Sequence, residues 1–129
     1  MGMAARYFLL VATGVVLGYV FLSLPPAVGF PDPELARLIA LHLPNAYVAL
    51  IAACMAGWHG IQYLRRRDPR SDVRSAVAAQ LAALFCFLTT ATGSVFAKVQ
   101  WGSYWNWDPR ETSVSVLLLV YAAYFLLRA

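Results

Sequence analysis

Residues 44–64 read PNAYVALIAACMAGWHGIQYL, a stretch without any Asp, Glu, Lys or Arg. A helix needs about 20 mostly apolar residues to cross the hydrocarbon core of a bilayer. Comparable stretches lie at residues 7–24, 73–97 and 111–127. Of the 129 residues, 61% are hydrophobic and 12% charged, which is about half the charged fraction of a soluble domain. The sequence therefore predicts an all-α, polytopic transmembrane helical bundle with four spans, forming one membrane domain over residues 1–129.

The charged residues predict the orientation of these spans. The apolar run at residues 7–24 is longer than the core of a signal peptide, so we expect a retained helix. Between the second and third spans lies a cluster of five arginines: Arg65, Arg66, Arg67, Arg70 and Arg74. Short basic loops stay in the cytoplasm. We therefore expect both termini to be cytoplasmic and residues 98–110 to face outward, which is the periplasm for a bacterial inner-membrane protein. The cluster contains two Asp residues and adjoins the membrane, which favours a topology determinant over nucleic-acid binding.

The first outward segment contains a candidate metal ligand. Asp32-Pro33-Glu34 is typical of a helix start, with an N-cap Asp and a Pro at the first helical position. The spacing predicts a short external amphipathic helix whose apolar face contains Leu35, Leu38, Ile39 and His42. His42 would end this helix just before Pro44. A histidine at an outward apolar boundary is a candidate axial ligand for heme iron. The alternative is an interfacial histidine that bonds a backbone carbonyl.

The second outward segment, residues 98–110, is rich in tryptophan. Three of the four tryptophans and one tyrosine fall within seven positions, as Trp101, Tyr104, Trp105 and Trp107. If the segment is partly helical, Trp101 and Trp105 form a shelf, and Gly102 allows a flat ligand to approach the backbone. An aromatic belt at the membrane interface is the alternative. A belt would scatter rings over all helix ends, whereas only Trp58 lies elsewhere.

Charged residues flank the aromatic segment on both sides. Lys98 and Arg110 are candidate partners for the two carboxylates of heme. Asp108-Pro109-Arg110-Glu111 has the pattern of a capping box, with an N-cap Asp, a Pro at the first helical position and a Glu at the third. We count Asp108 among the candidate cofactor-binding residues, and we expect it mainly to set where the aromatic segment ends.

Other polar residues exclude several functions. Cys54 and Cys86 are isolated within predicted spans, so neither covalent c-type heme attachment nor thioredoxin-like chemistry is supported. No nucleophile with a base and no paired catalytic carboxylates occur, so we do not expect an enzyme. Residues 89–94 are small and polar, which allows close helix packing or leaves space for a ligand.

The tryptophan-rich segment resembles the signature W-G-x-x-W-x-W-D-x-[RK]-x-[ST] of the heme-handling proteins of cytochrome c biogenesis, the WWD-motif family with CcmC-, CcmF- and CcsA-type members. Residues 93–98 resemble the approach to that signature, and residues 41–46 resemble the segment at the start of a CcmC-type helix. The resemblance extends from about residue 35 to the end. The Asp-Pro-Arg-Glu-Thr variant is closer to CcsA, while the histidine segment and the short spacing are closer to CcmC.

This resemblance implies a cofactor and partners. It implies that heme b binds non-covalently and transiently, with His42 as an axial ligand to its iron. It implies presentation of heme to a periplasmic heme chaperone or apocytochrome c, together with other cytochrome c biogenesis membrane subunits. These would be an ABC transporter pair for a CcmC-like protein or a synthase partner for a CcsA-like one.

The resemblance also implies six helices and a second external histidine, whereas no histidine follows His59 here. We therefore expect a second axial ligand from another subunit, a second copy of the chain, or a C-terminal half encoded separately or as a continuation.

Two functions of other classes remain open from the residues alone. A non-heme membrane scaffold could dock a periplasmic partner through the aromatic segment. A quinone-binding respiratory subunit could use an aromatic pocket with a histidine. Quinone has no carboxylates, so that function leaves Lys98 and Arg110 without a role. A Soret band in the absorption spectrum distinguishes heme binding from both.

Overall fold

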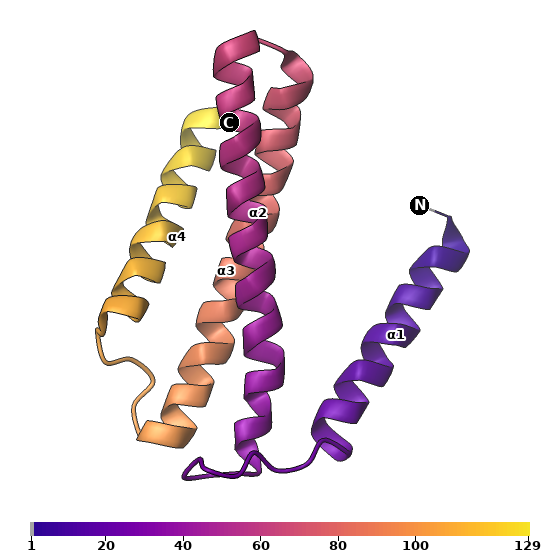
Figure 1. Cartoon of the computed structure of the whole chain (residues 1–129), viewed down its shortest axis with the longest axis vertical. Coiled ribbons are helices and arrows are strands. Elements are labelled where there is room, and N and C mark those ends of the chain that lie inside the picture. The colour runs from indigo at the N-terminus through magenta and orange to yellow at the C-terminus, as the bar shows by residue number, and fades with distance from the viewer. Residues whose placement is uncertain (1) are drawn as a thin grey trace.

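The computed structural model describes residues 2–129 and contains helices but no strand within them (Figure 1). Its elements are α1 (Met3–Leu22), η1 (Leu35–Leu38), α2 (Ile39–Arg66), α3 (Pro69–Trp101) and α4 (Pro109–Arg128), where η1 is a short 3₁₀ helix. Each α-helix is long and apolar enough to cross a membrane. The prediction of an all-α fold with four spans is confirmed.

Two helices begin at the same local sequence, Asp-Pro-Arg. The Asp68 carboxylate accepts a hydrogen bond from the Arg70 N–H at 3.1 Å, which starts α3. The Asp108 carboxylate accepts from the N–H groups of Arg110 and Glu111 at 2.8 and 2.9 Å, which starts α4. Each Asp therefore satisfies N–H groups that have no partner inside the helix. The predicted N-cap role of Asp108 is confirmed.

The α2–α3 hairpin is the core of the molecule. Most of the buried residues of α3 are small: Ser71, Ala78, Ala79, Ala82, Cys86 and Ala97. Ala52 is buried on α2, and the Ser75 hydroxyl donates to the Ala56 carbonyl at 2.9 Å. Small side chains let helix backbones approach closely, which is the usual basis of helix association in lipid.

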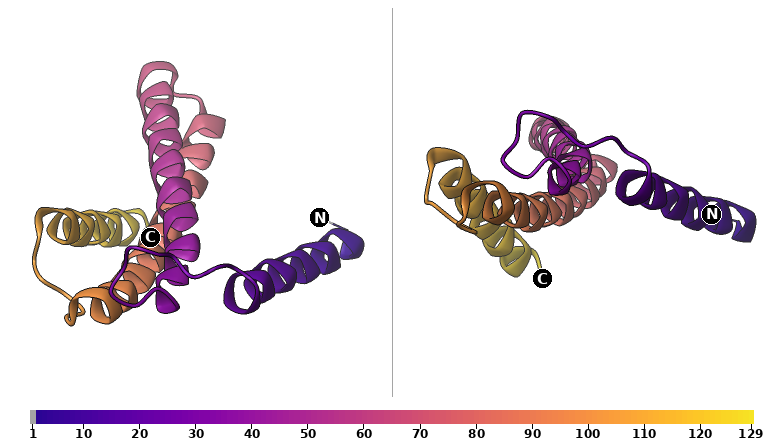
Figure 2. Two further views of the ribbon diagram at one scale, coloured as in Figure 1. Left: turned by 60° about the horizontal axis from the view of Figure 1, so that its bottom comes forward. Right: turned by 90° about the horizontal axis from the view of Figure 1, so that it is seen from below.

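Helices α1 and α4 lie at the periphery. In Figures 1 and 2, α1 extends away from the hairpin and approaches it only at its C-terminal end. Val20 is its one buried residue, and α4 has none. Arg37 links α1 to η1, because its guanidinium donates to the Phe21 carbonyl at 3.1 Å. Arg128 pairs with Asp72 through both nitrogens, so the end of α4 is tied to the start of α3. The outer apolar surfaces suit contact with lipid.

The molecule has two polar ends. We call the α2–α3 connection at residues 67–68 the turn end, and the end formed by residues 23–38 and 102–108 the cavity end. The helices alternate in direction, so the start of α1 and the end of α4 lie on the side of the turn end (Figure 1). Seven of the ten Lys and Arg residues lie there as well.

The start of α2 differs from the expected boundary. The helix expected to end at His42 is a 3₁₀ turn over Leu35–Leu38 that leads directly into α2, and α2 begins at Ile39. His42 therefore lies inside α2, and Pro44 does not begin the span. Pro44 is the sixth residue of the helix, so its missing N–H removes one intrahelical hydrogen bond. This bond lies close to the helix start, where the first N–H groups have no intrahelical partner.

Candidate functional site

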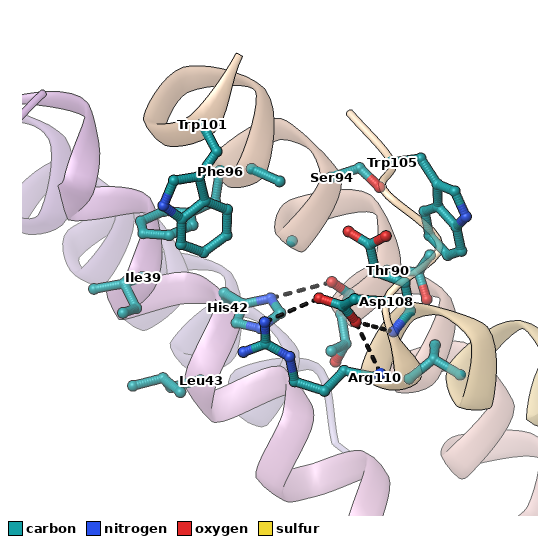
Figure 3. Close-up of a pocket in the computed structure, with 15 residues that line it drawn as sticks. Ile39, His42, Leu43, Thr90, Ser94, Phe96, Trp101, Trp105, Asp108 and Arg110 are labelled. Carbon is teal, nitrogen blue, oxygen red and sulfur yellow. Dashed lines mark hydrogen bonds and ion pairs between the residues drawn. The ribbon is translucent and has the colours of Figure 1, made fainter. Parts of the chain in front are cut away.

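A cavity of about 320 Å³ lies at the cavity end, between the start of α2, the last turns of α3 and the start of α4 (Figure 3). Its volume is at the lower end of the roughly 300–1,000 Å³ that ligand pockets occupy. Most of its wall is apolar or aromatic, and the lining includes His42, Gly93, Phe96, Trp101, Trp105 and Arg110. Five of the predicted site residues line it together: His42, Trp101, Trp105, Asp108 and Arg110.

His42 presents one ring nitrogen to α3 and leaves the other without a partner. Nδ1 lies 3.1 Å from the carbonyl oxygen of Thr89 and 3.3 Å from the hydroxyl of Thr92. Nε2 makes no hydrogen bond within residues 2–129, and it is not an enclosed atom. The expected alternative, a histidine that bonds a carbonyl, is therefore realised at Nδ1 alone. Nε2 can still act as a ligand.

The aromatic residues form two walls instead of one shelf. Figure 3 shows Trp101 and Trp105 on opposite sides of His42. Trp101 packs edge-to-face on Phe96, with ring centroids 5.7 Å apart, and Trp105 packs similarly on Trp107 at 5.8 Å. The shelf would require a helical segment beyond Trp101. Gly102 instead ends α3 in the left-handed conformation, with φ at 82°.

Three predicted site residues lie outside the cavity lining. Tyr104 and Trp107 are largely exposed beside it. The Lys98 amine donates to the Gly102 carbonyl at 2.9 Å and lies 5.4 Å from the centre of the Tyr104 ring. Lys98 thus caps the C-terminus of α3 and makes a cation–π contact. Its position is at the rim of the site.

Charged groups line the edge formed by the start of α4. Hydrogen bonds from the Glu111 N–H and from the Arg110 side chain hold the pKa of Asp108 below its ordinary value. The Arg110 guanidinium is 2.9 Å from the Asp108 carboxylate. The Glu111 carboxylate accepts from the Asn106 N–H at 2.6 Å, so it reaches two residues further back than in a standard capping box. These contacts fix how residues 102–108 enter α4.

A buried donor in the wall has no acceptor. The indole N–H of Trp105 is enclosed and makes no hydrogen bond within residues 2–129. A buried donor left unpaired costs about 1–3 kcal/mol. A ligand oxygen or a water molecule would remove this cost.

Gln100 supports the site, and its residue type alone did not reveal this role. Its buried side chain forms two hydrogen bonds with the backbone of Asp32: it accepts from the N–H at 3.0 Å and donates to the carbonyl at 2.9 Å. Phe30 adds an edge-to-face contact with Phe96 at 5.5 Å. Together they hold residues 23–38 against the end of α3. The only signal in the sequence was a lone amide beside Trp101.

The fold and the site define a polytopic helical membrane protein with an aromatic cavity around a histidine at one end. The chain matches the family described as CcmC, heme exporter protein C, over residues 2–129. The chain therefore belongs to the CcmC family.

Curated relatives agree with this assignment. The chain is 36% identical over 85 residues to heme exporter protein C of Bradyrhizobium diazoefficiens, covering 66% of this chain and 32% of that protein. It is 34% identical over 92 residues to a ccmC-like mitochondrial protein of cytochrome c biosynthesis from Marchantia polymorpha, covering 71% and 40%. It is 32% identical over 105 residues to heme exporter protein C of Paracoccus denitrificans, covering 77% and 44%. The chain thus spans less than half the length of these relatives.

Proposed function

We propose that this chain handles heme during cytochrome c biogenesis, binding heme b without a covalent bond at the cavity end. His42 carries the proposal, because its Nε2 is unpartnered in an aromatic cavity while its Nδ1 is already satisfied. Membership in a family described as heme exporter protein C supports heme as the ligand. The relatives of that name support the same substrate.

The donor set fits heme. A neutral imidazole nitrogen is a common axial ligand to heme iron. The faces of Trp101 and Trp105 provide apolar area for the macrocycle, and Tyr104 and Trp107 extend it at the edge.

Arg110 would pair with one propionate and Lys98 with the other; Arg110 can do so with two parallel hydrogen bonds. Asp108 orients Arg110 through their ion pair. A cavity of about 320 Å³ covers part of a macrocycle, which suits transient binding.

The same proposal includes a location and partners. The cavity end would face the periplasm of the bacterial inner membrane, and the turn end with its arginines would face the cytoplasm. Heme held at the cavity end would pass to a periplasmic heme chaperone or apocytochrome c. Other cytochrome c biogenesis subunits would assemble with the single membrane domain of this chain. Within residues 2–129, His42 is the only histidine at the cavity end, so a second axial ligand would come from outside them.

Heme titration of the purified chain in detergent tests the proposal. We expect a Soret band of mixed or high-spin character, because residues 2–129 supply one histidine at the site. Free imidazole should convert this spectrum to a low-spin form, and a partner chain with a second histidine should do the same. A folded chain that takes up no heme at any concentration would refute heme handling and favour a non-heme scaffold. A low-spin two-histidine spectrum from a proven monomer would refute the ligand count.

A further inference from the structure

The imidazole of His42 lies directly against the backbone of α3 at Gly93. A Cβ atom added to Gly93 would lie 2.9 Å from Cε1 of His42 and 3.2 Å from its Nδ1. The ring would have to move for any other residue at this position. Gly57, which also lies within a helix, has no atom within 4 Å of an added Cβ. Gly93 therefore leaves space for the His42 ring, because it has no side chain.

The hydrogen bonds at this position determine which ring nitrogen carries the proton. The carbonyl oxygen of Thr89 can only accept, so Nδ1 at 3.1 Å must donate to it. The Thr92 hydroxyl lies 2.8 Å from the carbonyl oxygen of Leu88, and its one proton goes to a helix carbonyl. Its lone pairs are then free to accept from the same Nδ1–H at 3.3 Å. Both contacts favour the neutral tautomer with the proton on Nδ1 and the lone pair on Nε2.

We propose that the turn of α3 from Thr89 to Gly93 is a positioning element that fixes the tautomer and the orientation of His42. Gly93 provides the space, the Thr89 carbonyl takes the Nδ1 proton, and Thr92 supports it. His42 then offers Nε2 to a metal in the cavity without first losing a proton or rotating. That the metal is heme iron rests on the proposed function; the tautomer does not.

The contact would also affect how strongly His42 binds a metal. When a histidine binds a metal, a hydrogen bond from its other ring N–H to a carbonyl orients the ring. This hydrogen bond also strengthens electron donation from the metal-binding nitrogen. Loss of such a partner commonly costs roughly 10- to 100-fold in metal affinity. Residues 89–93 would thereby determine how firmly His42 holds the metal.

The first experiment needs no heme. The chain has two histidines, so histidine-selective ¹⁵N labelling in detergent micelles gives two ring systems, and His42→Ala assigns them. At about pH 8.5, where an ordinary histidine is neutral, we expect His42 to show one protonated Nδ1 and one unprotonated Nε2. In Gly93→Ala the two tautomers of His42 should average, while Gly57→Ala should leave the spectrum unchanged. A wild-type His42 that is protonated on Nε2, or that averages between tautomers, would overturn the proposal.

The second experiment adds hemin to the same variants. We expect Gly93→Ala to weaken heme binding by about 10-fold or more, and Gly57→Ala to leave it unchanged. Thr92→Val removes the second acceptor without changing the shape, so it should lower the iron–histidine stretching frequency in the resonance Raman spectrum. Thr92→Ser should restore that frequency. If Gly93→Ala does not fold, Thr92→Val still tests the proposal. An unchanged iron–histidine stretching frequency in Thr92→Val would refute the positioning role of α3.

The two proposals fail in different ways. A wild-type chain with the Nδ1–H tautomer but no heme uptake would refute heme handling and support the positioning element. A chain that binds heme while His42 exchanges freely between tautomers would refute the positioning element and support heme handling.

Discussion

The turn end and the cavity end carry the same three local features: a histidine on α2, a nearby tryptophan and an Asp-Pro-Arg helix start. These are His59, Trp58 and residues 68–70 at the turn end, and His42, Trp105 and residues 108–110 at the cavity end. The two histidines are 17 positions apart on one helix, which separates them by about 25 Å. Local chemistry is thus repeated in two places, and only one of them became a candidate site.

The surroundings of the two histidines explain the difference. His59 contacts Gln62 of its own helix at 3.4 Å, whereas His42 contacts α3. At the turn end two residues connect the helices, and Gly60 lies close to Ser75, with 3.4 Å from an added Cβ to its hydroxyl. At the cavity end seven residues connect α3 to α4, and residues 23–38 also pack there. The longer connections leave room for a cavity beside the histidine.

The membrane orientation of the two ends gives the largest expected effect. Asn106 and Arg70 are both exposed, one at each end. In a chain whose Cys54 and Cys86 are replaced by Ala, Asn106→Cys should label almost completely with a membrane-impermeant thiol reagent in intact spheroplasts. Arg70→Cys should label only after lysis. The opposite pattern would place the cavity in the cytoplasm and contradict periplasmic presentation.

The two histidines give the next largest effect. His42→Ala should weaken heme binding by about 100-fold or abolish the Soret band, because residues 2–129 offer no other histidine at the cavity end. His59→Ala should leave the band unchanged, since His59 lies at the opposite end of α2. Hemin titration followed by absorption measures both. Equal losses in the two variants would show that the effect comes from folding and would contradict the assignment of the axial ligand.

The two Asp-Pro-Arg sequences provide a matched pair of arginines. Arg110→Ala should lower heme affinity by about 10-fold or more, because one charge-assisted contact to a propionate contributes roughly 1.5–3 kcal/mol. Arg70→Ala removes the same side chain from the equivalent position at the turn end and should have no effect. Arg110→Lys should recover part of the affinity. Titration of the three variants with hemin and with a heme dimethyl ester would separate the charge effect, since the ester has no carboxylates.

The smallest expected effect concerns the contact that holds residues 23–38 at the cavity end. Gln100→Ala leaves the half-buried N–H and carbonyl groups of Asp32 without these partners and should destabilise the fold by about 1–3 kcal/mol. Gln80→Ala, at an exposed position of the same helix, should change stability by less than about 0.5 kcal/mol. Denaturant unfolding in mixed micelles measures both. Hydrogen exchange of residues 30–36 should rise in Gln100→Ala alone.

The sequence by itself determined the class of fold and the number of spans. Long apolar runs allow one outcome in lipid, because every backbone group must be paired inside a helix. The Asp108 cap was predictable too, since an N-cap Asp followed by Pro acts through neighbouring N–H groups alone. The composition of the site was partly predictable, because five residues chosen for their chemistry line one cavity.

Only the tertiary structure decided the geometry at the cavity end. The sequence predicted a shelf of Trp101 and Trp105 for a partly helical segment, whereas α3 ends at the left-handed Gly102 and the two rings lie on opposite walls. The contacts of His42 with Thr89 and Gly93 join residues that are 47 and 51 positions apart in the sequence. No local pattern encodes such a contact, because it depends on how two helices approach each other. The chemistry of the histidine came from its residue type, and the nitrogen it offers was determined by the neighbouring helix.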